Sequence, residues 1–154
     1  MLAPFLIAIG QKRCLGYEMK GRNMDKSKRR ILVVDDEVAI QFSYRRLFRG
    51  AGVEVDACGT LEEALGMIGA TDYDVVMADV RLSHSEAHEG LDILEHIRRH
   101  KPATPVILMT GYGNPDIERR AAALGVLQYL VKPVQVSELM ELLARMGILP
   151  DNLP

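Results

Sequence analysis

Three aspartates, one threonine and one lysine follow short apolar runs in this sequence, and their side chains suit phosphoryl chemistry. In chain order they are Asp35, Asp36, Asp79, Thr110 and Lys132. Crowded carboxylates repel one another unless a cation neutralises them, and oxygen ligands without thiolate or imidazole favour Mg²⁺. A carboxylate can attack phosphorus when a metal ion and an ammonium group balance the charge. If the fold gathers these residues, they predict a magnesium-assisted site that accepts a phosphoryl group.

Each of these residues also has an ordinary explanation when it is taken alone. An aspartate after a strand is commonly a turn former or a helix cap, and a threonine can serve the same purpose. A single lysine is more often a solvated surface residue. Because the residues stand together at the ends of successive apolar runs, we favour the joint functional interpretation.

Short apolar runs alternate with longer amphipathic segments from residue 30 onward, which predicts a repeated βα pattern. Apolar runs that are rich in β-branched residues and bounded by charge suit strands buried on both faces. The expected strands cover residues 31–34, 53–58, 74–79, 105–109 and 126–131. The expected helices cover residues 37–50, 61–69 and 115–124, with two more striped by Leu91, Leu94 and Ile97 and by Val136, Leu139, Leu143 and Met146.

Strands separated by helices of this length predict an α/β domain of three layers. Such a domain has a parallel sheet with right-handed crossovers and helices on both faces. Its ligands bind at the carboxyl ends of the strands, which is where the five candidate residues would lie. Local signals agree, because Thr60 and Glu63 form a capping box before the second helix and Pro115 stands in the first turn of the fourth.

The composition is typical of a soluble globular protein. The chain has 154 residues, of which 48% are hydrophobic and 26% charged, with a net charge of -2. This charge argues against nucleic-acid binding through bulk electrostatics. Cys14 and Cys58 lack a metal-binding spacing, so we expect reduced thiols. No apolar run approaches the roughly 20 residues that cross a bilayer, and residues 2–9 lack the positive start of a secretory signal, so we expect a cytoplasmic protein.

We expect residues 29–148 to form one domain. Residues 1–28 are expected to be an extension outside the fold that is disordered or derives from an upstream start, since Met24 opens a more usual beginning. Residues 149–154 are expected to be a C-terminal tail. This organisation leaves no room for a separate output domain in the chain as it stands.

The sequence resembles the response-regulator receiver family of two-component signalling, including its chemotaxis-type single-domain members, over residues 30–146. The motifs are ILVVDDE at 31–37, DVVMAD at 74–79, GLDIL at 90–94, PVILMTG at 105–111 and YLVKP at 129–133. The resemblance implies a flavodoxin-like fold of five βα units with strand order 2-1-3-4-5. The segment 81–89 departs from the family, because it lacks a proline and carries about three extra residues.

By position, the resemblance implies that Asp79 is the phosphoacceptor and that Mg²⁺ binds beside it. Asp36 would bind the ion directly, and Asp35 would bind it directly or through water. Asp79 itself and the backbone carbonyl of Arg81 would be the remaining protein ligands.

The resemblance also implies a conformational switch. Thr110 and Lys132 would contact the phosphoryl group, and Tyr129 would swing inward when Thr110 moves toward it. Without phosphate, Tyr129 would point outward, and the Lys132–Pro133 bond would be cis. Phosphorylation would thus favour a second arrangement of the surface formed by the fourth helix, fifth strand and fifth helix.

The implied partners are proteins. A histidine kinase or a histidine phosphotransfer protein would supply the phosphoryl group, and a downstream protein would bind the switched surface. A homodimer is left open, and we expect no nucleic-acid binding by this chain itself and no membrane contact. The activity would be limited to Mg²⁺-assisted self-phosphorylation and slow autodephosphorylation, so we do not expect an enzyme.

Other functions remain as alternatives. The chain could be an interaction module of the same fold that works without phosphorylation, or a receiver fragment of a longer regulator. An aspartyl-phosphate phosphatase usually has a second aspartate where Arg81 stands, which disfavours that class. A nucleotide-binding enzyme would carry phosphate-cradling glycines after its first strand, and none follow residues 31–34.

Overall fold

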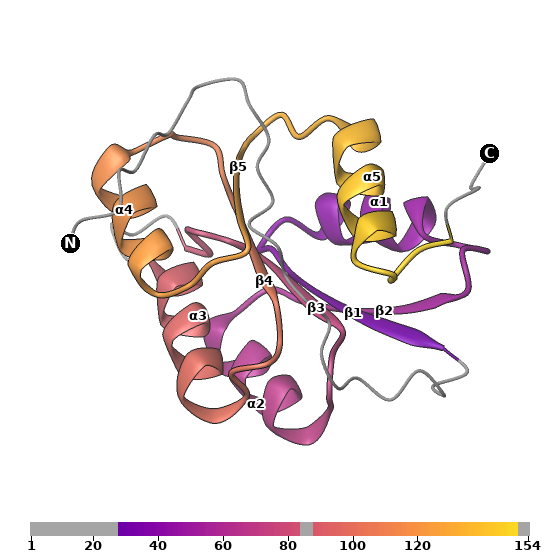
Figure 1. Cartoon of the computed structure of the whole chain (residues 1–154), viewed down its shortest axis with the longest axis horizontal. Coiled ribbons are helices and arrows are strands. Elements are labelled where there is room, and N and C mark those ends of the chain that lie inside the picture. Colours follow the sequence, from indigo (N-terminus) through magenta and orange to yellow (C-terminus); the bar gives the residue numbers. More distant parts are fainter. Residues whose placement is uncertain (1–27, 84–87, 151–154) are drawn as a thin grey trace.

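The computed structural model describes residues 28–83 and 88–150 as alternating strands and helices (Figure 1). The strands are β1 (Arg29–Val34), β2 (Val53–Cys58), β3 (Val75–Asp79), β4 (Val106–Thr110) and β5 (Gln128–Val131). The helices are α1 (Val38–Leu47), α2 (Leu61–Ala70), α3 (Glu89–His100), α4 (Pro115–Ala123) and α5 (Val136–Arg145). The predicted tail past residue 150, nearly all of the predicted N-terminal extension, and residues 84–87 of the 81–89 segment lie outside the described residues.

The strands form one parallel sheet in the order β2-β1-β3-β4-β5, which confirms the predicted flavodoxin-like topology. The central strands β1, β3 and β4 are buried on both faces, because their alternating residues pack against different helices. Leu32, Val76 and Leu108 face a core shared with α2, α3 and α4. Ile31, Val75 and Ile107 face the other core, shared with α1 and α5. Figure 1 shows these two groups of helices on opposite sides of the sheet.

The predicted signals at the helix starts are present. The Thr60 hydroxyl accepts a hydrogen bond from the backbone N–H of Glu63, and the Glu63 carboxylate in turn accepts one from the backbone N–H of Gly59. Pro115 begins α4, and the Asn114 side chain caps its first turn. These caps satisfy backbone donors that have no partner inside the helix.

The structure differs from the sequence-based prediction at the ends of several elements. α1 ends at Leu47 rather than near residue 50, and β5 begins at Gln128 rather than at residue 126. Val136 was expected on the inner stripe of α5 but is 53% exposed, because it opens the helix at the carboxyl edge of the sheet. Leu142 is buried in that helix instead. At the other end of the domain, burial continues as far as Leu149.

None of the described helices combines the length and the apolar character that crossing a bilayer requires.

Candidate functional site

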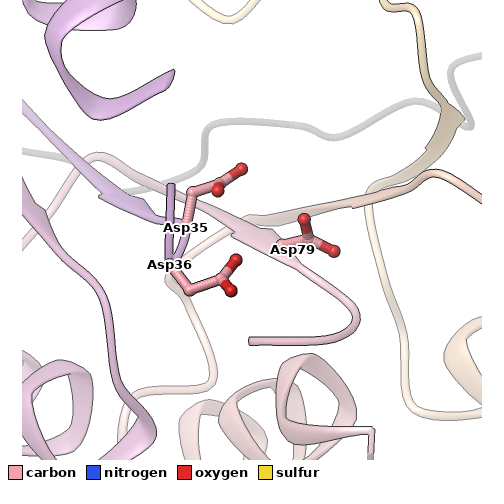
Figure 2. Close-up of side chains that lie close together, drawn as sticks. All are labelled: Asp35, Asp36 and Asp79. Carbon is pink, nitrogen blue, oxygen red and sulfur yellow. The ribbon is translucent and has the colours of Figure 1, made fainter. Parts of the chain in front are cut away.

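The candidate residues lie together at the carboxyl edge of the sheet. Asp35 and Asp36 follow β1, and Asp79 ends the neighbouring strand β3 (Figure 2). One carboxylate oxygen from each of these aspartates lies within 4.8 Å of the other two. Because parallel strands present their carboxyl ends at one edge, the topology alone explains why residues so distant in sequence meet here.

Lys132, which follows β5, bridges two of the three aspartates. Its Nζ donates hydrogen bonds to Asp79 Oδ2 at 2.6 Å and to Asp35 Oδ2 at 2.9 Å. Burial by itself would lower the pKa of Lys132, but hydrogen bonds and charge from Asp79 and Asp35 outweigh burial and raise it. The lysine is therefore a fixed cation at neutral pH. The predicted convergence of the first, third and fifth strand ends is confirmed.

The three carboxylates have different surroundings. Asp35 is fully buried, and its Oδ1 accepts a hydrogen bond from the Glu37 backbone N–H at 2.9 Å. Asp79 is 9% exposed, and its Oδ1 accepts one from the Arg81 backbone N–H at 3.0 Å. Asp36 is exposed and accepts no hydrogen bond from any described residue. Asp36 is thus the carboxylate most available to a cation from solvent.

The donor set fits a hard divalent cation. Each aspartate offers carboxylate oxygen, and no cysteine or histidine joins the group of Asp35, Asp36 and Asp79 among the described residues. Mg²⁺ prefers such oxygen ligands and commonly uses one or two carboxylates together with water and phosphate oxygens. The role of the Arg81 carbonyl as a further ligand stays a prediction.

Thr110 ends β4 next to the site, but its hydroxyl is occupied elsewhere. The side chain is buried, and its Oγ1 donates to the Tyr112 carbonyl at 2.9 Å and accepts from the Tyr112 N–H at 3.2 Å. Among the described residues, the hydroxyl therefore stabilises the turn between β4 and α4 and does not contact Asp79. Its predicted contact with a phosphoryl group would require this turn to rearrange.

We expected Tyr129 to point outward in a protein without phosphate, but it does not. Its hydroxyl is buried and has no hydrogen-bond partner among the described residues, and its half-buried side chain packs against the core shared with α2, α3 and α4. Burial raises the pKa of Tyr129. The physical reason is the apolar contact area of the ring, which stabilises the inward position although the hydroxyl loses its water. The predicted cis bond between Lys132 and Pro133 is present.

Sequence reasoning missed three residues that shape the site. Gly90 approaches the chain after β3 so closely that a Cβ there would lie 2.4 Å from the Asp79 carbonyl oxygen. The Glu89 carboxylate accepts hydrogen bonds from the Ser83 hydroxyl at 2.5 Å and the Leu82 N–H at 3.3 Å. Gln41 donates to the Asp35 carbonyl. Gly90 had a signal in the GLDIL motif, whereas the other two residues contact the loop before their own helix without a recognisable sequence pattern.

Comparisons with known proteins agree on one family. The sequence-family model of the response regulator receiver domain matches residues 31–144. The chain is 32% identical over 122 residues to transcriptional regulatory protein ZraR of Salmonella typhimurium, covering 79% of this chain and 27% of that protein. It is 30% identical over 118 residues to response regulator protein PilR of Pseudomonas aeruginosa, covering 77% and 26%. The chain thus spans about a quarter of the length of these curated relatives.

Solved structures show the same likeness. A CheY-like response regulator receiver domain protein from Methanospirillum hungatei JF-1 superimposes with a TM-score of 0.72 at 27% identity, covering 79% of this chain and 95% of that one. Response regulator protein TrrA from Thermotoga maritima, in complex with Mg²⁺ and BeF, gives a TM-score of 0.65 at 30% identity, covering 77% and 98%.

Proposed function

Since this chain belongs to the response regulator receiver domain family of two-component signalling, we propose that Asp79 accepts a phosphoryl group with the help of Mg²⁺. The observation that carries the proposal is the convergence of three carboxylates and one ammonium group. Lys132 donates to both Asp35 and Asp79, and all three aspartates offer oxygen atoms within 4.8 Å of one another. Few structural roles require an exposed acid, two buried acids and a lysine at one sheet edge.

Asp79 is the nucleophile of the proposed reaction. One of its carboxylate oxygens forms a bond to phosphorus while the bond from phosphorus to the donor breaks. With a phosphohistidine donor, the leaving group is an imidazole nitrogen, which takes up a proton from water. Asp79 is suited to this role because the lysine and the Arg81 N–H hold its carboxylate in one orientation while it keeps access to solvent.

Mg²⁺ would be held by Asp35, Asp36, Asp79 and the Arg81 carbonyl. When bound, the ion would supply positive charge that balances the carboxylates and the incoming phosphoryl oxygens. Lys132 supplies a second cation through its hydrogen bond to the Asp79 carboxylate. This division explains why one lysine can coexist with a metal site of three acids.

The output of the proposed site is a change in a protein surface. Thr110 would exchange its hydrogen bonds to Tyr112 for one to the phosphoryl group, which frees the turn before α4. Tyr112 and Val131, which are 84% and 52% exposed, lie on this side of the molecule beside α4 and on β5. Receivers interact with kinases or phosphotransfer proteins, and we propose that a downstream protein, or a second copy of the chain, reads this surface.

Mass mapping after exposure to a phosphodonor tests the proposal. The full chain is incubated with acetyl phosphate or a candidate kinase, with and without Mg²⁺, and the modified residue is identified. We expect modification of Asp79, dependence on Mg²⁺ and complete loss in Asp79→Asn. No response to phosphodonor or to beryllofluoride, or an unchanged response in Asp79→Asn, would overturn the proposal and favour an interaction module that works without phosphorylation.

A further inference from the structure

Gln41 links helix α1 to the turn that carries the first two aspartates. Its side-chain Nε2 donates a hydrogen bond of 2.8 Å to the backbone carbonyl of Asp35. Its own backbone N–H donates to the Glu37 carbonyl at 3.1 Å, so the residue belongs to the first turn of α1. The side chain therefore reaches back from a rigid helix to a peptide bond at the candidate metal site.

The turn between β2 and α2 lies close to the hydrogen bond between Gln41 and Asp35. A Cβ at Gly59 would lie 3.4 Å from Gln41 Nε2 and 3.6 Å from both the Asp35 carbonyl oxygen and the Asp36 Cα. The Gly59 N–H is itself fixed by the Glu63 carboxylate at 3.0 Å. The Gln41 amide, on a half-buried side chain, thus lies between the aspartate turn and the capped start of α2.

The hydrogen bond to the Asp35 carbonyl affects the orientation of the peptide bond between Asp35 and Asp36. The Asp35 backbone N–H already donates to the Cys58 carbonyl, and its carboxylate is held by Glu37 and Lys132. The carbonyl oxygen lies in the peptide plane that leads to Asp36, so a hydrogen bond to it orients this plane and helps to fix where the Asp36 Cα lies. Because the Asp36 carboxylate has no hydrogen bond to a described residue, its position depends on this backbone rather than on a side-chain partner.

We propose that Gln41 is a positioning residue for the metal site, which holds the Asp35–Asp36 peptide in the orientation that Mg²⁺ requires. The inference rests on the proposed function, since it concerns the same carboxylates. Residues that orient the metal-ligating groups through hydrogen bonds typically change the metal affinity by 10- to 100-fold when they are removed. Mg²⁺ demands near-ideal octahedral geometry, whereas Ca²⁺ tolerates irregular sites. A looser turn should therefore weaken the binding of Mg²⁺ more than that of Ca²⁺.

Calorimetric titration of the full chain with each ion alone tests the inference. In Gln41→Leu, which removes the donor at similar size, we expect the Kd for Mg²⁺ to rise about tenfold and the Kd for Ca²⁺ to rise clearly less. Ser43→Ala is the matched control, because its hydroxyl also donates to a carbonyl in α1, that of Ala39, but is exposed and does not touch the aspartate turn.

The outcomes separate the inference from the function on which it rests. If the wild-type chain binds neither ion at the aspartates, the proposed function fails. If wild type binds Mg²⁺ and Gln41→Leu binds it equally well, or loses Mg²⁺ and Ca²⁺ affinity to the same degree, the positioning role is overturned. Should Gln41→Leu fail to fold, Gln41→Ala provides the second variant, since it removes the same N–H donor to the Asp35 carbonyl. An unchanged ratio of the two affinities there would equally overturn it.

Discussion

The three carboxylates of the site differ in their hydrogen bonds and in their burial, and these differences indicate a separate role for each. Both carboxylate oxygens of Asp35 accept hydrogen bonds inside the protein, so this fully buried residue mainly anchors Lys132. Asp36 faces solvent and is available to an incoming cation. Asp79 shares the lysine but remains partly accessible, as a nucleophile must. Two buried acids, of which Asp79 keeps 9% of its surface exposed, and one exposed acid therefore make a site that is assembled before any ligand arrives.

Lys132 balances these charges, which leads to a prediction about Mg²⁺ and stability. Lys132→Met leaves the carboxylates without their cation, so we expect the free energy of unfolding to fall by about 2 kcal/mol, below the value for a fully buried pair because the lysine side chain is 24% exposed. Added Mg²⁺ should restore most of the loss, which urea unfolding with and without the ion would show. Because the pKa of Lys132 is raised in the folded protein, its contribution to the free energy of unfolding is fully present below pH 10.5, the pKa of an unperturbed lysine. The contribution is lost as the pH rises toward the folded-state pKa.

Lys101 offers a matched control for that variant. Its Nζ donates to the Thr71 carbonyl at 3.0 Å and to Asp72 Oδ1 at 2.7 Å, and its side chain is 25% exposed. Lys101→Met removes a lysine of similar burial with two hydrogen bonds, but from a place without clustered acids. An equal rescue of both variants by Mg²⁺ would contradict the electrostatic explanation.

The buried hydroxyl of Tyr129 leads to a second prediction. Since the hydroxyl lacks a partner among the described residues, Tyr129→Phe should raise the free energy of unfolding of the unphosphorylated chain by about 1 kcal/mol. Tyr73→Phe should do the opposite, because the Tyr73 hydroxyl donates to Asp56 at 2.9 Å in a side chain that is 5% exposed. Parallel urea unfolding of both variants checks the pair. Destabilisation by Tyr129→Phe would mean that the hydroxyl is bonded in the native state.

At the scale of elements, the junction of β3 with α3 is the tightest point near the site. A Cβ on Gly90 would lie 2.4 Å from the Asp79 carbonyl oxygen and 2.7 Å from the Val80 Cα, and neither backbone atom can move without moving the nucleophile. We expect Gly90→Ala to lower the free energy of unfolding by about 2 kcal/mol or more and to slow phosphorylation. Gly66→Ala, in the open middle of α2, should instead raise it by about 0.5–1 kcal/mol. Chemical denaturation of both variants measures the contrast, and a neutral Gly90→Ala would contradict it.

The elements themselves could be predicted because each carries its own signal. The central strands are continuous apolar runs, and α2 and α4 begin at recognisable caps. The same reasoning placed the site, since parallel strands fix where their ends meet. It failed where neighbours decide the outcome: Val136 is exposed because the sheet ends beside it, and Tyr129 turns inward because a core lies there to receive it. No pattern that predicted the elements also indicates the hydrogen bond from Gln41 to the Asp35 carbonyl in the turn before α1.

At the scale of the whole molecule, the site stands between two differently built halves. On the β1 side, Asp35 and its turn are tied to β2 and α1 by several hydrogen bonds. On the β4 side, Thr110 is tied to its own turn through Tyr112, and Tyr129 carries an unsatisfied hydroxyl nearby. A perturbation at Asp79 should therefore be transmitted toward α4 and β5, where alternative hydrogen bonds are available, and not toward β2.

The hydroxyl of Thr110 would be the connection between those regions, and its removal should separate binding from response. Thr110→Val keeps the shape of a side chain that is 4% exposed but cannot donate to a phosphoryl-like ligand. With Mg²⁺ and beryllofluoride, we expect the variant to bind the ligand at Asp79 but to lose most of the amide NMR shifts that wild type shows at Tyr129, Val131 and along α4. Amides of β2 should change little in either protein, which provides the internal reference. Equal shifts in variant and wild type would show that the signal leaves the site by another route.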